Sequence, residues 1–122
     1  QRRRQMHLEL TMNRIMAEVP TADVIVTNPT HFAIALRYRP GQDKAPMVVA
    51  KGMDNLALHI RTIARRNGVP IVENRAVARA LYKRVKVGKQ VPSAMFQQVA
   101  RILAEVFRRR GKRGAGAPRV HV

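Results

Sequence analysis

Residues 23–32 read DVIVTNPTHF, a short β-branched run that ends at an Asn-Pro pair. The run from Asp23 to Thr27 has the composition of a buried strand, and Asn28-Pro29 interrupts it. From Phe32 to Tyr38, large and small side chains alternate, which predicts a second strand with its large side chains on one face. We therefore expect two neighbouring strands joined by a short turn at residues 28–31.

Upstream of this pair, residues 5–18 carry apolar side chains among polar ones at roughly helical spacing. Pro20 ends the pattern. We predict a helix with a basic start, whose apolar positions are Met6, Leu10, Ile15 and Met16.

Downstream, capping residues and apolar stripes divide the rest of the chain into strands and helices. We expect a loop at 41–46 and a strand at 47–50, followed by a helix that Asp54 or Asn55 caps and Asn67-Gly68 closes. A strand at 69–72 and a short helix from an Asn74 cap to Leu81 come next. A basic connection at 83–89 then leads to a last helix that begins at Pro92-Ser93. The apolar stripes of the two longer helices are Leu56, Ile60, Ile63 and Ala64, and Met95, Val99, Ile102, Leu103 and Val106.

This order of elements predicts an α/β fold with a small mixed β-sheet of about four strands flanked by about four helices. The N-terminal helix protrudes from it. We divide the chain into an N-terminal helix at 1–20, an α/β domain at 21–107 and a basic flexible tail at 108–122. The tail contains Arg108, Arg109, Arg110, Lys112 and Arg113 together with Gly and Pro.

The composition limits the possible sites. A chain of 122 residues with 46% hydrophobic residues fits one folded domain. It has no Cys, and its four His residues show no zinc-ligand spacing, so neither a disulfide nor a metal or other cofactor is implied. No apolar run is long enough for a membrane helix or forms a secretory signal. Because the chain begins at Gln1 rather than Met, we expect a fragment of a longer protein.

The net charge of +17, from 24 Lys and Arg against 7 Asp and Glu, implies an acidic partner. A nucleic acid, an anionic membrane leaflet and an acidic protein face all fit, and solubility alone is the plainer explanation. Aromatic residues make up only 4% of the chain, which leaves little surface for base stacking, and no recognised nucleic-acid-binding motif is present. We therefore predict no specific nucleic-acid partner.

The segment Asn28-Pro29-Thr30-His31 has its own chemistry. Pro29 has no backbone N–H, which closes the usual route of asparagine ageing through the next residue's nitrogen. The side-chain amide of Asn28 can instead attack its own main-chain carbonyl carbon, form a succinimide and release the proline nitrogen. The backbone is then cut between Asn28 and Pro29.

An amide nitrogen is a poor nucleophile, so such a reaction depends on geometry. A tight turn that holds the nitrogen near the carbonyl contributes on the order of 7–11 kcal/mol in the best cases. His31 can assist proton transfer near neutral pH or simply shape the turn, and Thr30 can hydrogen-bond within it. On the dipeptide alone an ordinary turn is the more frequent outcome, and the position between two strands favours the reaction.

The segment around this turn resembles the NPTH signature of the FlhB/YscU family, the self-cleaving export-switch proteins of type III secretion. The resemblance covers about residues 5–107 and extends well beyond the tetrapeptide. The matching segments are APMVVAKG at 45–52, IRTIA at 60–64, GVPIVE at 68–73, ARALY at 78–82, and the Val-Gly and Val-Pro pairs at 87–88 and 91–92.

The resemblance implies cleavage between Asn28 and Pro29, with Asn28, Pro29, Thr30 and His31 as the site. The two pieces stay together as one domain, and the cut switches export to late substrates. The chain is then the cytoplasmic domain of a membrane-anchored protein at the bacterial inner membrane, with residues 1–20 leading down from the membrane. Implied partners are export substrates, the length-control ruler protein, other export-gate membrane components and its own cleaved fragment.

Segment 45–52 is more similar to flagellar members, so we expect a flagellar protein. An injectisome (needle-complex) member with the same switch role stays open as an alternative, as does, with less support, a basic nucleic-acid-binding module. An adaptor of the same fold that is not cut is a further alternative. In none of these is the chain a turnover enzyme, because Asn28 is consumed in a single self-cleavage.

Overall fold

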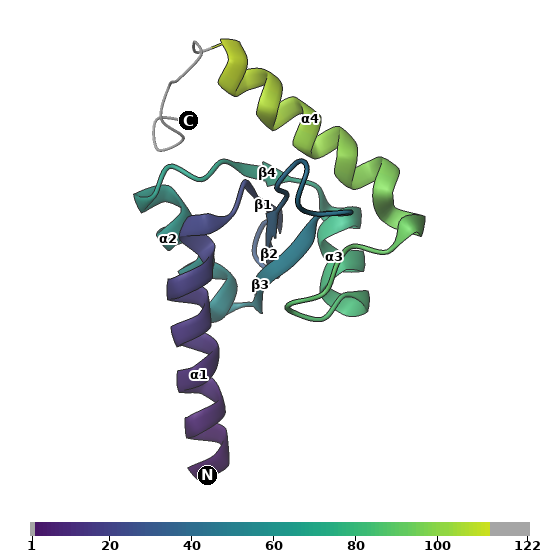
Figure 1. Cartoon of the computed structure of the whole chain (residues 1–122). Coiled ribbons are helices and arrows are strands. Elements are labelled where there is room, and N and C mark those ends of the chain that lie inside the picture. The colour runs from purple at the N-terminus through teal and green to yellow at the C-terminus, as the bar shows by residue number, and fades with distance from the viewer. Residues whose placement is uncertain (1, 113–122) are drawn as a thin grey trace.

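A computed structural model describes residues 2–112 of the chain. The elements are helix α1 (Arg2–Glu18), the 3-10 turn η1 (Val19–Thr21), strands β1 (Val24–Asn28), β2 (Phe32–Arg37) and β3 (Met47–Met53), helix α2 (Asn55–Arg66), strand β4 (Ile71–Glu73), helix α3 (Arg75–Arg84), the 3-10 turn η2 (Ser93–Met95) and helix α4 (Phe96–Lys112). Helices lie on both sides of one sheet, which confirms the predicted α/β class (Figure 1).

The four strands form a single mixed sheet in the order β3-β2-β1-β4. The β1–β2 and β2–β3 pairs are antiparallel, whereas β4 runs parallel to β1. Strand β1 therefore has a partner on each side, and Val24, Ile25 and Val26 are fully buried in it. The end of this central strand is where the Asn-Pro pair lies.

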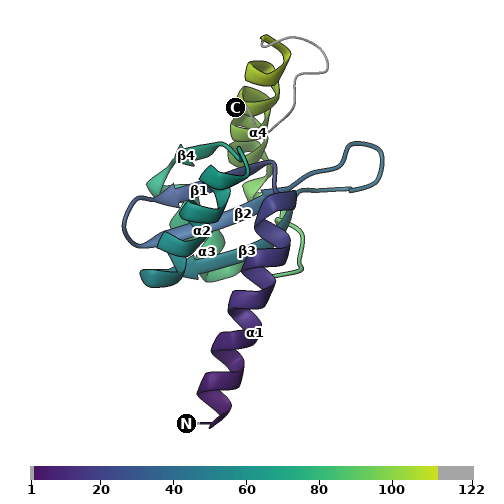
Figure 2. The same cartoon turned by 90° about the vertical axis from the view of Figure 1, so that its left-hand side faces the viewer.

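β2 has its large and small side chains on opposite faces, as predicted, and the two faces contact different cores. Ile34 and Leu36 face the core formed with α3 and α4, whereas Ala33 and Ala35 face the core formed with α2 and the end of α1. Figure 2 shows α2 and α1 in front of the sheet and α3 behind it. The small side chains bring α2 close to the sheet: a Cβ on Gly52 would lie 2.7 Å from the Cβ of Leu56.

The predicted stripe of the last helix is confirmed, since Val99, Ile102, Leu103 and Val106 of α4 are buried, as is Met95 of the preceding turn η2. Helix α4 continues further than predicted. Residues 108–112, expected to be flexible, continue this helix, and Arg110 among them pairs with the buried Asp23. The rest of the predicted tail, 113–122, lies outside the described residues.

Helix α1 begins at Arg2 and protrudes from the domain (Figures 1 and 2). Of its predicted apolar positions only Ile15 is buried; Met6, Leu10 and Met16 remain 60%, 65% and 59% exposed because most of the helix extends past the sheet. Ile15 and Val19 belong to the core on the α2 side, so the end of this helix is part of the packed domain. No helix among residues 2–112 is long and apolar enough to cross a membrane.

Element boundaries differ from the prediction by a few residues. Strand β3 continues to Met53 because β2 pairs with it as far as Phe32. Strand β4 begins at Ile71 rather than at residue 69, and α3 extends to Arg84, so the predicted connection at 83–89 begins later. The Asn74 side chain caps α3 as predicted, accepting from Val77 N at 3.1 Å. Asp54 precedes α2, but its side chain makes no cap.

The Asp23 carboxylate connects the residue before β1 with the last part of α4. Removal of this carboxylate is expected to destabilise the fold. The side chain accepts from Tyr38 N at 2.7 Å and pairs with Arg110 at 3.1 Å, while Asp23 is only 6% exposed. Asp23→Ala leaves a guanidinium and an amide without this partner, so we expect a loss of about 3 kcal/mol in the free energy of unfolding, measured by urea titration.

Glu105→Ala is the matched control for Asp23→Ala. It removes a carboxylate from α4, the helix that carries Arg110. The partners of Glu105, Arg108 and Arg109, are exposed, and exposed ion pairs contribute little. Equal losses of stability in the two variants would contradict the role given to Asp23.

Candidate functional site

The four residues singled out from the sequence form one tight turn between β1 and β2. Asn28 and Phe32 are paired across the strands, and the N–H of His31 donates to the carbonyl oxygen of Asn28 at 2.8 Å. This bond closes a β-turn with Pro29 and Thr30 at its centre. Proline favours the first central position of such a turn, and Thr30 has no positive φ, which fits type I rather than type II.

Three further contacts hold the turn from outside. The N–H of Asp54 donates to His31 O at 2.9 Å, and the N–H of Asn74 donates to Thr27 O at 2.9 Å. Arg61 of α2 donates from its Nη1 to the carbonyl of Pro29. The starts of α2 and α3 therefore clamp the residues on both sides of the Asn28–Pro29 bond.

The carbonyl of Asn28 is the group on which negative charge would develop if a nucleophile attacked it. A hydrogen-bond donor held at that oxygen stabilises such charge without reorganisation. The backbone N–H of His31 occupies this position at 2.8 Å, and the strand pairing between β1 and β2 fixes it. The turn therefore polarises the bond whose cleavage the sequence predicts.

The ring of His31 lies near the charged side chain of Asp54. The His31 Nδ1 is 3.9 Å from Asp54 Oδ1, and both side chains are 65% exposed, so this contact contributes little. The ring centre lies 6.3 Å from that of Phe32. Among the described residues, His31 contacts Asn28 by a hydrogen bond from its backbone and not from its ring. Any residue except proline could make this backbone bond, so the role of the His31 side chain stays a prediction.

Asp54 is held in an unfavourable backbone conformation, with φ 55° and ψ −112°. It is the only non-glycine residue with positive φ among residues 2–112. Such a conformation costs on the order of 1–3 kcal/mol and persists only where the surroundings enforce it. Here its N–H bonds to His31 and its carbonyl accepts from Leu58 N in the first turn of α2.

Sequence reasoning found the turn but missed two of its supports. Arg61 was grouped with a helix that matched a family segment, and nothing in the sequence connects it with Pro29, which is 32 positions away. Asp54 was expected only as a helix cap. The third support, Asn74, was predicted as a cap, although its backbone contact with Thr27 was not.

Comparison with known proteins identifies the family of the chain. The sequence model of the FlhB HrpN YscU SpaS family matches residues 1–106. The chain belongs to this family. It is 51% identical over 109 residues to the flagellar biosynthetic protein FlhB of Bacillus subtilis and 46% identical over 116 residues to that of Escherichia coli K12. These alignments cover 89% and 95% of the chain, but only 30% of each relative.

Solved structures of the family share the fold. The cytoplasmic domain of FlhB from Shewanella putrefaciens superposes with a TM-score of 0.78 at 44% identity, covering 87% of this chain and 82% of that one. A variant of the EscU C-terminal domain superposes with a TM-score of 0.73 at 33% identity, covering 75% of this chain and 92% of that one. The turn described above therefore belongs to a chain that shares the fold of these FlhB and EscU domains.

Relief of the strain at residue 54 provides a test of the clamp in this FlhB/YscU-type chain. Glycine adopts positive φ without steric cost, and the Asp54 side chain is exposed and makes no cap. We expect Asp54→Gly to raise the free energy of unfolding by about 1 kcal/mol, after the extra entropy of the unfolded chain is subtracted. Urea denaturation measures the change.

Asp54→Ala is the control, because alanine keeps the strain. It should show no gain in stability. If the alanine variant were as stable as the glycine variant, the backbone conformation at residue 54 would carry no cost and the account of the clamp would be wrong.

Proposed function

We propose that the chain is the self-cleaving switch domain of a flagellar type III protein-export component. Asn28, Pro29, Thr30 and His31 are its site. The observation that carries the proposal is the Asn28 carbonyl, which accepts a hydrogen bond from His31 N–H inside a turn clamped by α2 and α3. Membership of the family and the identity to flagellar relatives support the flagellar assignment over the injectisome one.

The reaction is an internal acyl transfer. The side-chain nitrogen of Asn28 attacks the Asn28 carbonyl carbon and loses one proton, while the oxygen takes up negative charge facing the His31 N–H. The carbon–nitrogen bond to Pro29 then breaks, and the proline nitrogen receives a proton. The products are a succinimide at residue 28 and a free secondary amine at residue 29, and water later opens the imide.

Residues of the turn, together with Arg61, have separate roles in this reaction. Asn28 supplies both the nucleophile and the carbonyl, and Pro29 supplies a leaving nitrogen that carries no N–H. His31 stabilises the developing charge through its backbone. Arg61 holds the Pro29 carbonyl, so that the bond to be broken stays in a fixed position during the attack. Because Asn28 is consumed, the reaction runs once per chain.

Substitutions in a relative have the same spacing. Solved variants of the EscU C-terminal domain replace an asparagine, the proline that follows it, and a histidine three positions after the asparagine. The same residue types stand at Asn28, Pro29 and His31. This agreement supports the assignment of the site in the present chain.

The architecture keeps the pieces together after a cut. Residues 1–28 would carry β1, which pairs with β2 along five residues and with β4 along three and buries Val24, Ile25 and Val26. The cut removes the covalent link in the turn but leaves these contacts in place. The first piece therefore remains a partner of the second, and only the turn gains freedom to move.

That local freedom is the proposed switch. Freed from β1, residues 29–31 can rearrange against the starts of α2 and α3 and so change the surface offered to export substrates, to a length-control ruler protein and to other export-gate components. The relatives are about three times as long as the aligned segment. We propose that α1 leads from the membrane-anchored remainder at the cytoplasmic face of the bacterial inner membrane.

Intact mass under denaturing conditions tests self-cleavage. We expect two pieces, residues 1–28 and 29–122, that elute together under native conditions, whereas Asn28→Ala should remain a single 13.8 kDa chain. A wild-type chain that stays intact through incubation at neutral to alkaline pH would leave only an uncut adaptor.

The clamp makes a second prediction. Arg61→Ala frees the Pro29 carbonyl, so cleavage should become at least about tenfold slower, since small misplacements lose much of a positioning effect. The fraction cut, followed by denaturing electrophoresis from the start of synthesis, measures the rate. Arg65→Ala is the control: it removes an exposed charge from the same helix. Equal rates for Arg61→Ala and the wild type would exclude a role for the clamp.

A further inference from the structure

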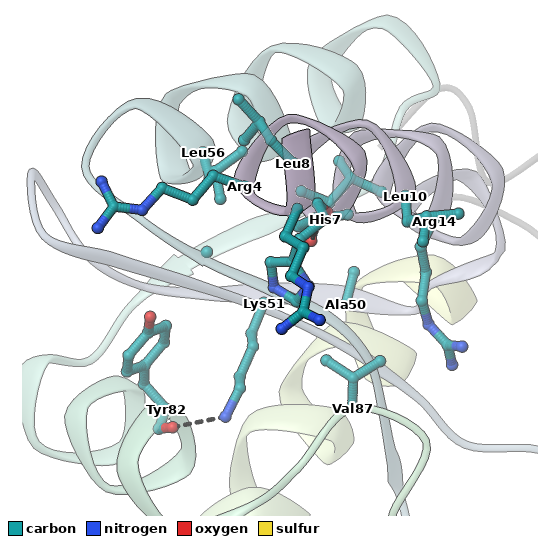
Figure 3. Close-up of a pocket in the computed structure, with 14 residues that line it drawn as sticks. Arg4, His7, Leu8, Leu10, Arg14, Ala50, Lys51, Leu56, Tyr82 and Val87 are labelled. Atoms are coloured by element: carbon teal, nitrogen blue, oxygen red, sulfur yellow. Dashed lines mark hydrogen bonds between the residues drawn. The ribbon is translucent and has the colours of Figure 1, made fainter. Parts of the chain in front are cut away.

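A groove with a volume of about 910 Å³ lies between α1 and β3, the strand at one edge of the sheet. Figure 3 shows α1 with His7 and Arg14 on one side, Tyr82 and Val87 on the other, and Ala50 and Lys51 of β3 between them. None of the four turn residues lines this groove. It is therefore a second surface with its own properties.

The charges that line the groove all have one sign. Arg3, Arg4 and Arg14 come from α1, and Lys51 comes from β3. No Asp or Glu is among the described residues that line it. A concave site lined by one sign of charge concentrates ligands of the opposite sign, so the groove selects an anionic partner.

The groove also presents apolar side chains to its occupant. Leu8 and Leu10 of α1 line it and are 52% and 65% exposed, and Leu56 and Val87 line it from α2 and the loop after α3. Exposed leucines around a hollow mark a surface that gains from being covered. A purely ionic ligand such as free phosphate would leave this apolar lining unused.

The floor of the groove is the edge of the sheet. β3 is the outermost strand of the sheet, and on its outer side segment 86–91 bonds only as far as Val48, through Lys89, Gly88 and Val91. Arg14 Nε donates to Val49 O at 3.3 Å. Beyond that point, within residues 2–112, Ala50–Gly52 have no backbone partner other than β2; Ala50 and Gly52 are buried, and Lys51 between them is partly exposed. An edge of this kind can accept another extended strand.

Lys51 adds a charge that is incompletely compensated. Its Nζ donates to the carbonyls of Tyr82 at 2.7 Å and Val85 at 3.0 Å, at the end of α3. Burial, and then the charge of Lys86, lower the pKa of this ammonium group. A carboxylate bound nearby would offset both effects, because an opposite charge favours the protonated amine.

We infer that this groove binds an extended acidic segment of a partner protein, which adds as a strand to the edge of β3 at Ala50–Gly52. Alternate side chains of the segment would point to α1 and to the Tyr82 side. Carboxylates on one face of the segment would pair with Arg3, Arg4 and Arg14 of α1, and apolar side chains on its other face would cover Tyr82 and Val87. The inference does not depend on self-cleavage.

A model peptide tests this inference on the whole 122-residue chain carrying Asn28→Ala, so that cleavage plays no part. The probe is a fluorescein-labelled peptide of about eight residues that alternates Val and Glu, long enough for one strand. We expect saturable binding and changes in the backbone amide NMR signals of Ala50–Gly52. Arg3→Glu with Arg4→Glu should weaken binding about tenfold, since both side chains are exposed and the fold stays intact.

Two controls separate this model from general charge attraction. Arg65→Glu with Arg66→Glu makes the same change of charge at exposed positions of α2, outside the groove, and should leave binding nearly unchanged. Two further peptides carry N-methyl groups along one or the other backbone edge, and one of them should fail to bind.

Several results would overturn the inference. Equal losses in the two double variants would mean that binding follows net charge alone. Unchanged binding of both N-methylated peptides would exclude strand addition. Displacement of the peptide by a single-stranded oligonucleotide or by anionic vesicles, with the same dependence on Arg3 and Arg4, would assign the groove to a different class of partner.

Discussion

Strand β1 is the element on which the rest of the structure depends. It pairs with β2 on one side and β4 on the other, and its side chains are buried between helices on both faces. The strand is paired on both sides as far as Thr27, and its last residue, Asn28, pairs with Phe32 of β2. The strand pairing on either side of the turn therefore fixes the geometry of the turn. The same pairing retains residues 1–28 if the backbone is cut after them.

The supports of the turn come from elements distant in sequence, which explains why a tetrapeptide alone is a weak indicator. Arg61, Asp54 and Asn74 reach the turn because α2 begins after β3 and α3 begins after β4, so that both helices begin near it. An Asn-Pro pair in an exposed loop would have none of these contacts. The strain at Asp54 is consistent with a position that several elements determine together.

Patterns along the chain predicted what depends on local preference. The alternation of β2 and the stripe of α4 could be predicted because burial follows the period of each element. The Asn74 cap could be predicted because asparagine is a preferred residue at the start of a helix. The failures have physical causes. Met6 and Leu10 repeat at helical spacing but have no neighbouring element to cover them, and residues 108–112 were judged by composition although Arg110 is held by Asp23, 87 positions away.

The basic residues of the chain have different local roles, which the net charge does not reveal. Several arginines surround the groove beside β3, whereas Arg110 neutralises a buried carboxylate and Arg61 holds the turn. One residue type thus contributes to stability, to positioning and to the proposed binding groove. The same net charge on a different fold would indicate only a general attraction to anions.

The central claim is that the Asn28 side chain itself cuts the backbone. The most direct measurement is the mass of the freshly released piece 1–28 at early times and mildly acidic pH, where the imide opens slowly. The account predicts a species lighter by one water than the peptide acid, which then converts to the heavier form. A piece that has the full mass of the acid from its first appearance would show that water or a protease cuts the bond, and would contradict the mechanism.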